Sequence, residues 1–90
     1  MQVIKIGAAW CPGCLIMRPR WKKIEEKYPW LATKNYDFDE DKKNIDKHSI
    51  NVKLLPTFIF LDKSGSELHR VSGELSEKKL IDLITKYKDS

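Results

Sequence analysis

The sequence has few cysteines and no long apolar segment. Its 90 residues include only two cysteines, Cys11 and Cys14, whereas a small secreted domain held together by disulfides usually carries four or more. No apolar run approaches the ~18 residues of a membrane span, and residues 1–6 lack the basic and apolar parts of a secretory signal. We therefore expect a cytoplasmic protein with no membrane span and no disulfide framework.

Neither sign of charge dominates, and the sequence contains no repeat or flexible linker. Lys and Arg number 17 against 13 Asp and Glu, for a formal net charge of +4. This mixture does not favour a nucleic-acid partner. A length of 90 residues suits one hydrophobic core and is too short for two. We expect residues 1–90 to form a single domain.

The apolar pattern predicts an α/β protein with the element order β-α-β-α-β-β-α. The strand candidates, rich in β-branched and aromatic residues, are residues 3–6, 34–38, 57–61 and 67–71. The helix candidates are residues 11–28, 39–49 and 76–87. The first two strands are joined through a helix and should be parallel, whereas the short turn between the last two makes them antiparallel. Together these rules predict a four-stranded mixed sheet with helices on both faces.

The first and last helices each show an apolar stripe at helical spacing. In the first helix the stripe consists of Ile16, Met17, Ile24 and Tyr28. In the last helix it consists of Leu80, Ile81, Ile84 and Tyr87. Pro19 lies inside the first helix, where it removes a backbone hydrogen bond and should kink the axis.

Cys11 and Cys14 lie where a strand gives way to a helix. Two cysteines placed at random have this separation in roughly 2% of cases, so the spacing is informative. At the start of a helix, the dipole and the free N–H groups stabilise a thiolate, and Pro12 suits the first turn. Cys14, one turn in, is close enough to attack a mixed disulfide formed at Cys11. The pattern predicts a nucleophilic thiol with a resolving partner.

Three other uses of the cysteines remain open at this point. A structural disulfide across so short a loop adds little stability and does not survive in a reducing cytosol. A zinc site would need His48 and His69 as further ligands, but neither has ligand-type spacing, so we expect no metal. Two buried, inert thiols are the third alternative.

Four landmarks of the sequence resemble the thioredoxin family. Residues 10–14, Trp-Cys-Pro-Gly-Cys, look like the family's Trp-Cys-Gly-Pro-Cys with the two middle residues exchanged, and Pro19 matches a helix-kinking proline. Leu55-Pro56-Thr57 matches a segment whose cis-proline faces the cysteines, and Gly73 matches the glycine beyond the hairpin. The resemblance covers nearly the whole chain. It implies a minimal thioredoxin fold without the extra N-terminal strand and helix of full-length members.

The resemblance also implies a thiol-disulfide oxidoreductase that reduces protein disulfides. Cys11 would attack as a thiolate, and Cys14 would displace the product. The implied supporting residues of the active site are Trp10, Pro12, Gly13 and Pro56. The implied substrate contacts are Trp10, Leu55, Pro56 and Gly73. No cofactor beyond the Cys11–Cys14 disulfide is implied, the electron donor is a flavin-dependent thioredoxin reductase or glutathione, and a monomer is expected.

Two positions depart from the family's pattern. Members usually carry a buried acid six residues before the first cysteine, where this chain has Lys5. We expect Lys5 to snorkel or to pair with Asp37 or Asp39 on the next strand. The alternative hypothesis is that its charge lowers the pKa values of the cysteines.

The proline directly after Cys11 is the second departure. It resembles the glutaredoxin motif Cys-Pro-Tyr-Cys, as does the short length of the chain. A glutaredoxin-like, glutathione-coupled reductase therefore stays open as an alternative. A redox-switched protein-binding module without turnover is another.

Overall fold

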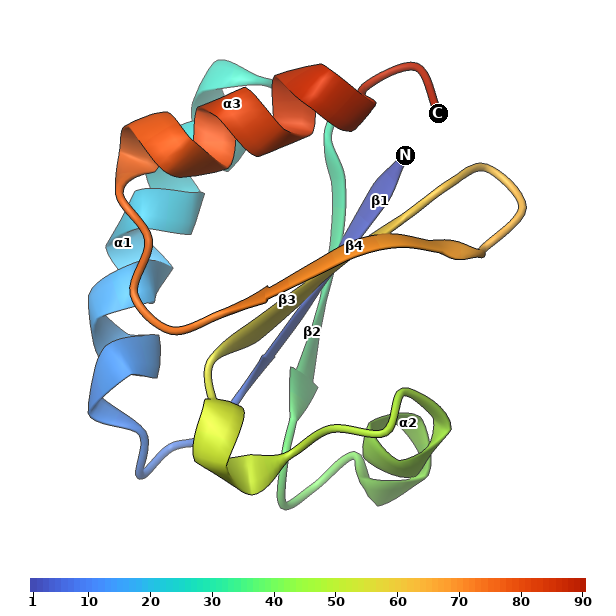
Figure 1. Cartoon of the computed structure of the whole chain (residues 1–90). Helices are drawn as coiled ribbons and strands as arrows, with labels where there is room; N and C mark the ends of the chain where they lie inside the picture. The colour runs from blue at the N-terminus through green and yellow to red at the C-terminus, as the bar shows by residue number, and fades with distance from the viewer.

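A four-stranded mixed sheet forms the centre of the protein (Figure 1). The computed structural model describes residues 1–90 and places the strands in the order β2-β1-β3-β4. The strands are β1 (Gln2–Gly7), β2 (Ala32–Asp37), β3 (Thr57–Leu61) and β4 (Glu67–Ser72). Strand β1 pairs parallel with β2 and antiparallel with β3, and β3 pairs antiparallel with β4. The predicted mixed sheet is confirmed.

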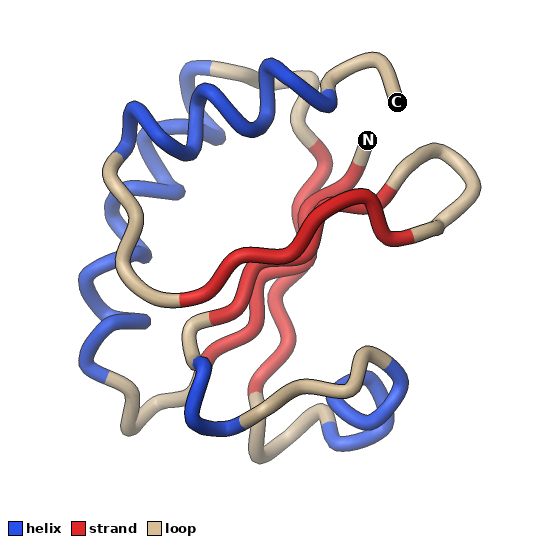
Figure 2. Tube along the Cα trace, viewed as in Figure 1, coloured by secondary structure: helices blue, strands red, loops and turns tan.

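Helices cover both faces of the sheet. The helices are α1 (Pro12–Lys27), α2 (Lys42–Lys47), α3 (Glu77–Tyr87) and the 3₁₀ turn η1 (Val52–Leu54). Figure 2 shows the strands nearly edge-on, with α1 and α3 on one side and α2 on the other. None of the helices combines the length and the apolar character needed to cross a membrane. Apart from η1, which was not predicted, the element order is the expected one.

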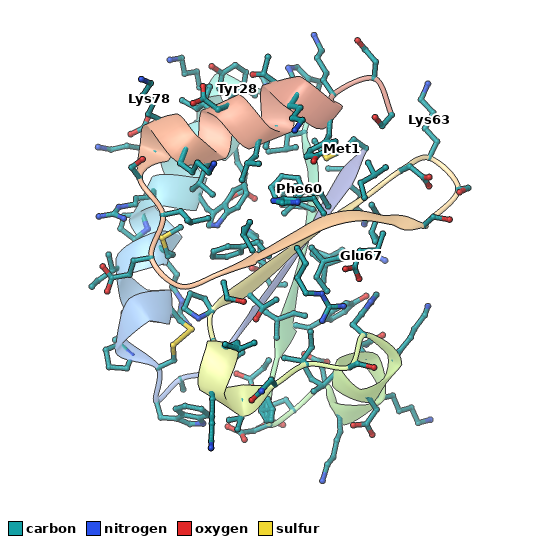
Figure 3. The ribbon with its side chains drawn as sticks, viewed as in Figure 1. Met1, Tyr28, Phe60, Lys63, Glu67 and Lys78 are labelled. Atoms are coloured by element: carbon teal, nitrogen blue, oxygen red, sulfur yellow. A yellow bond between two sulfur atoms is a disulfide. The ribbon has the colours of Figure 1, made fainter.

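The larger hydrophobic core fills the space between the sheet and helices α1 and α3. Because side chains alternate along a strand, Val3, Phe58 and Phe60 point to this face. Figure 3 shows Phe60 between α3 and the sheet. The helical members of this core are Met17, Trp21, Ile24, Leu80, Leu83 and Ile84. Burial of each aliphatic or aromatic side chain contributes roughly 1.5–3 kcal/mol, so this core carries most of the stability.

The opposite face holds a smaller core. Its five buried members are Ile4, Ile6, Ile45, Ile59 and Leu61. Ile45 is the one that comes from helix α2, and the other four come from β1 and β3. The two faces of the sheet are therefore unequally covered.

The expected apolar stripe of α1 is wrong at one position. Ile16 is 42% exposed, whereas Cys14, Met17, Trp21 and Ile24 are buried. These four residues are spaced three, four and three apart, which keeps them on one face of the helix. Ile16 precedes Met17 by one residue, or about 100° of helical rotation, and so turns toward solvent. Pro19 lies inside α1, as expected.

Candidate active site

The two cysteines form a disulfide where β1 leads into α1. The bond is visible in yellow in Figure 3, and the two Cα atoms lie 5.3 Å apart. Both residues are buried, Cys11 at 4% and Cys14 at 6% exposure. With Ala8 they form a separate small cluster, which we call the cysteine cluster, and Phe38 and Leu55 pack against it. The structure thus places the pair at the strand-to-helix junction that the sequence predicts.

Cys11 is the N-cap residue of helix α1. Its backbone is extended, and its sulfur accepts a hydrogen bond from the N–H of Cys14 at 3.2 Å. Pro12 occupies the first helical turn, where its missing N–H costs no helical hydrogen bond. An N–H donor and the positive end of the helix dipole both favour negative charge on this sulfur. The geometry therefore suits a thiolate at Cys11.

Gly7 allows β1 to approach Cys14 closely. A Cβ atom at position 7 would lie 2.9 Å from Cys14 Sγ and 3.3 Å from its Cβ. Only glycine leaves room for the sulfur, because real Cβ atoms do not come that close. Gly7 was not among the predicted site residues, although a glycine that ends a strand just before the motif is a signal of close backbone approach.

The loop that carries Pro56 is held against the cysteine motif. The Leu55–Pro56 peptide bond is cis, and the Pro56 carbonyl accepts a hydrogen bond from the Gly73 N–H at 2.8 Å. Gly73 has a φ of +89°, in the left-handed region that favours glycine. A Cβ atom at Gly13 would lie 3.2 Å from Pro56 Cδ. The structure thus brings Gly13, Pro56 and Gly73 together.

Trp10 lies on the surface beside the cysteines. Its side chain is 55% exposed, and its indole N–H donates a hydrogen bond to the Asp39 carboxylate at 2.8 Å. Phe38 meets the Trp10 ring edge-on, with 6.5 Å between ring centroids. Asp39 was not predicted as this partner, because the two residues are far apart in sequence and no motif links them.

Lys5 pairs with helix α1, and the expected pairing with Asp37 or Asp39 is wrong. Its ammonium lies 3.1 Å from each carboxylate oxygen of Glu25, and its side chain is 11% exposed. Strand alternation is the reason, since Lys5 points with Val3 toward the face that α1 covers. There Lys5 Nζ also lies 5.6 Å from the centroid of the Trp21 ring.

A pocket of about 400 Å³ lies beside Cys14. Lys5, Trp21, Asn35 and Asp37 contribute to its lining. The indole N–H of Trp21 is buried and has no hydrogen-bond partner. Ala8 and Cys14 also line the pocket, which therefore lies between the cysteine cluster and Lys5.

The side chains with displaced pKa values lie outside the cysteine cluster and its pocket. Burial is the main cause that lowers the pKa of His48. A hydrogen bond from the Ser64 hydroxyl lowers the pKa of Asp62, and the Arg70 guanidinium lowers that of Glu67. No group of three or more His, Cys, Asp or Glu side chains is arranged to hold a metal ion.

The family model, the relatives and the solved structures that match this chain all point to the same family. A family model described as Thioredoxin matches residues 1–86. A thioredoxin from Ophiophagus hannah is 34% identical over 85 residues, which cover 94% of this chain and 77% of the relative. A thioredoxin from Pongo abelii is 30% identical over 78 residues, covering 87% and 72%. The solved structure of Fasciola hepatica thioredoxin superposes with a TM-score of 0.84 at 30% identity, covering 94% of this chain and 78% of that one.

A buried Cys-x-x-Cys disulfide at the start of a helix, on this sheet topology, defines the class of thiol-disulfide oxidoreductases. With the agreement of family model, relatives and solved structures, the chain belongs to the thioredoxin family. Family membership implies protein disulfides as substrates and a reductase as partner. The redox-active disulfide takes the place of a cofactor.

Proposed function

We propose that the protein reduces protein disulfides, with Cys11 as the nucleophile and Cys14 as the resolving thiol. The observation that carries this assignment is the N-cap position of Cys11, whose sulfur accepts the Cys14 N–H. Cys14 lies one turn inside the helix, against Gly7. The sulfur that accepts a backbone N–H at the helix start is therefore that of Cys11, which supports Cys11 as the thiolate.

The reaction consists of two thiol-disulfide exchanges. In the dithiol form, the Cys11 thiolate attacks one substrate sulfur, the substrate S–S bond breaks, and the other substrate sulfur leaves and takes up a proton. Cys14 then loses its proton and attacks the Cys11 sulfur of the mixed disulfide. The second substrate thiol leaves, and the Cys11–Cys14 bond forms. Two electrons have moved to the substrate, and an external donor must return them.

The substrate would lie along the Pro56 loop. Leu55 has an extended backbone, with φ −77° and ψ 144°, which suits pairing with an extended substrate segment. Several large apolar side chains of the motif, the first turns of α1 and η1 are exposed: Trp10, Leu15, Ile16, Val52 and Leu54. Such exposed apolar groups favour contact with a protein substrate.

Cysteine variants test the assignment of roles. Cys11→Ser should abolish reduction of insulin disulfides with dithiothreitol as donor, because no attacking thiolate remains. Cys14→Ser should keep the attack but accumulate a mixed disulfide between Cys11 and the substrate, visible by mass spectrometry. Turnover in Cys11→Ser, or a mixed disulfide trapped at Cys14 when Cys11 is replaced, would contradict the roles. Circular dichroism of the variants controls for folding.

The electron donor is proposed to be a flavin-dependent thioredoxin reductase in the cytoplasm, with the protein acting as a monomer. The dithiol must be regenerated by such a donor after each cycle, and the cytosol is a compartment where thiols are kept reduced. A reduction potential below roughly −250 mV would support this donor, and one above roughly −220 mV would favour glutathione. Catalytic turnover would exclude the alternative of a redox-switched binding module.

A further inference from the structure

Glu74 is an acidic side chain beside the cysteine motif that the exchange reaction does not use. A Cβ atom built on Gly13 would lie 3.7 Å from Glu74 Cγ and 4.0 Å from its Oε1. The same atom would lie 3.2 Å from Pro56 Cδ. Glu74 is exposed, so its carboxylate lies at the surface next to the motif's glycine and the cis-proline.

The backbone on both sides of Glu74 is fixed. Before it, the Gly73 N–H is bound to the Pro56 carbonyl. After it, the Leu75 N–H donates to Met17 Sδ at 3.3 Å, and the Leu75 carbonyl accepts from Arg20 at 2.8 Å. Figure 1 shows this segment, between β4 and α3, passing beside α1. Glu74 is therefore held at the site by its neighbours in sequence.

The carboxylate of Glu74 has no partner within the chain. Neither of the two ion pairs, Lys5–Glu25 and Arg70–Glu67, involves it, and it accepts no side-chain hydrogen bond; the guanidinium of Arg20 is bound to the Leu75 carbonyl. Residues 8–17 carry no charge, and Arg18 follows them. The Glu74 carboxylate beside Gly13 is therefore a negative charge at the motif that no ion pair within the chain neutralises.

We propose that Glu74 makes the enzyme favour disulfides flanked by lysine or arginine. The inference rests on the proposed function, since it concerns a substrate segment lying along Leu55 and Pro56. In that position, residues next to the substrate cysteine pass the Glu74 carboxylate. An exposed pair of opposite charges at contact distance changes binding by roughly two- to fivefold, and a like-charged pair acts in the opposite sense.

Two synthetic peptide disulfides test this proposal. They are identical except that lysine flanks the cysteine in one and glutamate in the other. With dithiothreitol as donor, the wild type should show a kcat/KM for the lysine peptide that is several-fold higher, and 0.5 M salt should reduce the difference. Glu74→Gln should lower this ratio two- to fivefold, mainly through KM, and Glu74→Lys should reverse it.

A charge-matched control lies on helix α1. Glu26→Gln removes an exposed acid near the far end of α1, roughly 20 Å from Cys11 along the helix, and should leave the ratio unchanged. An unchanged ratio in both Glu74 variants would overturn the proposal. So would an equal change for both peptides together with a shifted reduction potential, because Glu74 would then act through the cysteines. Failure of the wild type to reduce either peptide or insulin would contradict the proposed function itself.

Discussion

The larger core and the cysteine cluster share helix α1 but are built in opposite ways. The core consists of ten buried side chains, with aromatic rings such as Trp21 and Phe60 filling the space between helices and sheet. The cysteine cluster has three small members, and its shape depends on backbone: Gly7 and Gly13 at close approaches, and Gly73 in a left-handed turn. Stability thus comes from large buried side chains. The positions of the sulfurs depend instead on glycines, which have no Cβ atom and so leave room for close contacts.

The largest effect is expected for a substitution in the larger core, which should lower the stability of the fold and leave the rate of disulfide reduction unchanged. Phe60 is fully buried and packs against Tyr87 with 5.9 Å between ring centroids. Phe60→Ala should lower the free energy of unfolding by roughly 3–5 kcal/mol, measured by denaturant titration of the oxidised protein. Phe60→Leu provides a milder step if the alanine variant does not fold. The folded fraction should reduce insulin at the wild-type rate, and a parallel loss of activity would show that the two regions are not independent.

The second largest effect is expected at Gly7, where a substitution should lower the activity more than the stability. Gly7→Ala places a methyl group 2.9 Å from Cys14 Sγ, so that the sulfur must move. We expect a loss of roughly tenfold or more in insulin reduction, with a stability cost of about 1–3 kcal/mol. Gly65→Ala is the matched control, because Gly65 has a φ of +88° in the hairpin turn but nothing within 4 Å of an added Cβ. Equal activity losses in both variants would contradict this explanation.

The smallest effect concerns Lys5, which lies in both regions. Its ammonium is paired with Glu25 beside Trp21, and it also lines the pocket next to Cys14. If its charge stabilises a thiolate, Lys5→Met should raise the pH midpoint of alkylation by iodoacetamide, by up to about one unit. Lys5→Met also leaves the Glu25 carboxylate without its cation, and this negative charge would itself raise the midpoint. The double variant Lys5→Met/Glu25→Gln removes that second cause. An unchanged midpoint in both would leave Lys5 with a purely structural role.

Features that follow from local rules could be predicted from the sequence. Strand β3 and the N-cap at Ser76 are found where propensity and capping rules place them, and Ser76 accepts a hydrogen bond from the Lys79 N–H. The cysteines lie at the strand-to-helix junction because an apolar strand directly precedes them. Each of these features depends on residues within a few positions of one another.

Features that depend on tertiary contacts could not be predicted. The partner of Lys5 is Glu25, twenty residues away on another element, and only the helix packing brings them together. The Trp10–Asp39 hydrogen bond and the position of Glu74 over Gly13 likewise join segments that no spacing rule connects. The turn η1 is three residues long, too short for a periodic signal.

The central place of β1 has a consequence for the order of events during synthesis. The strand is made before β2 and β3, yet it lies between them and pairs with both. On the ribosome, one edge of β1 therefore waits for β3 to emerge, roughly 50 residues later, or a few seconds at usual rates of translation. Over that interval the two thiols are already present on a chain whose sheet is incomplete. Because the chain has only these two cysteines, the one disulfide that they can form within it is the Cys11–Cys14 bond of the finished fold, so early oxidation cannot trap a wrong pairing.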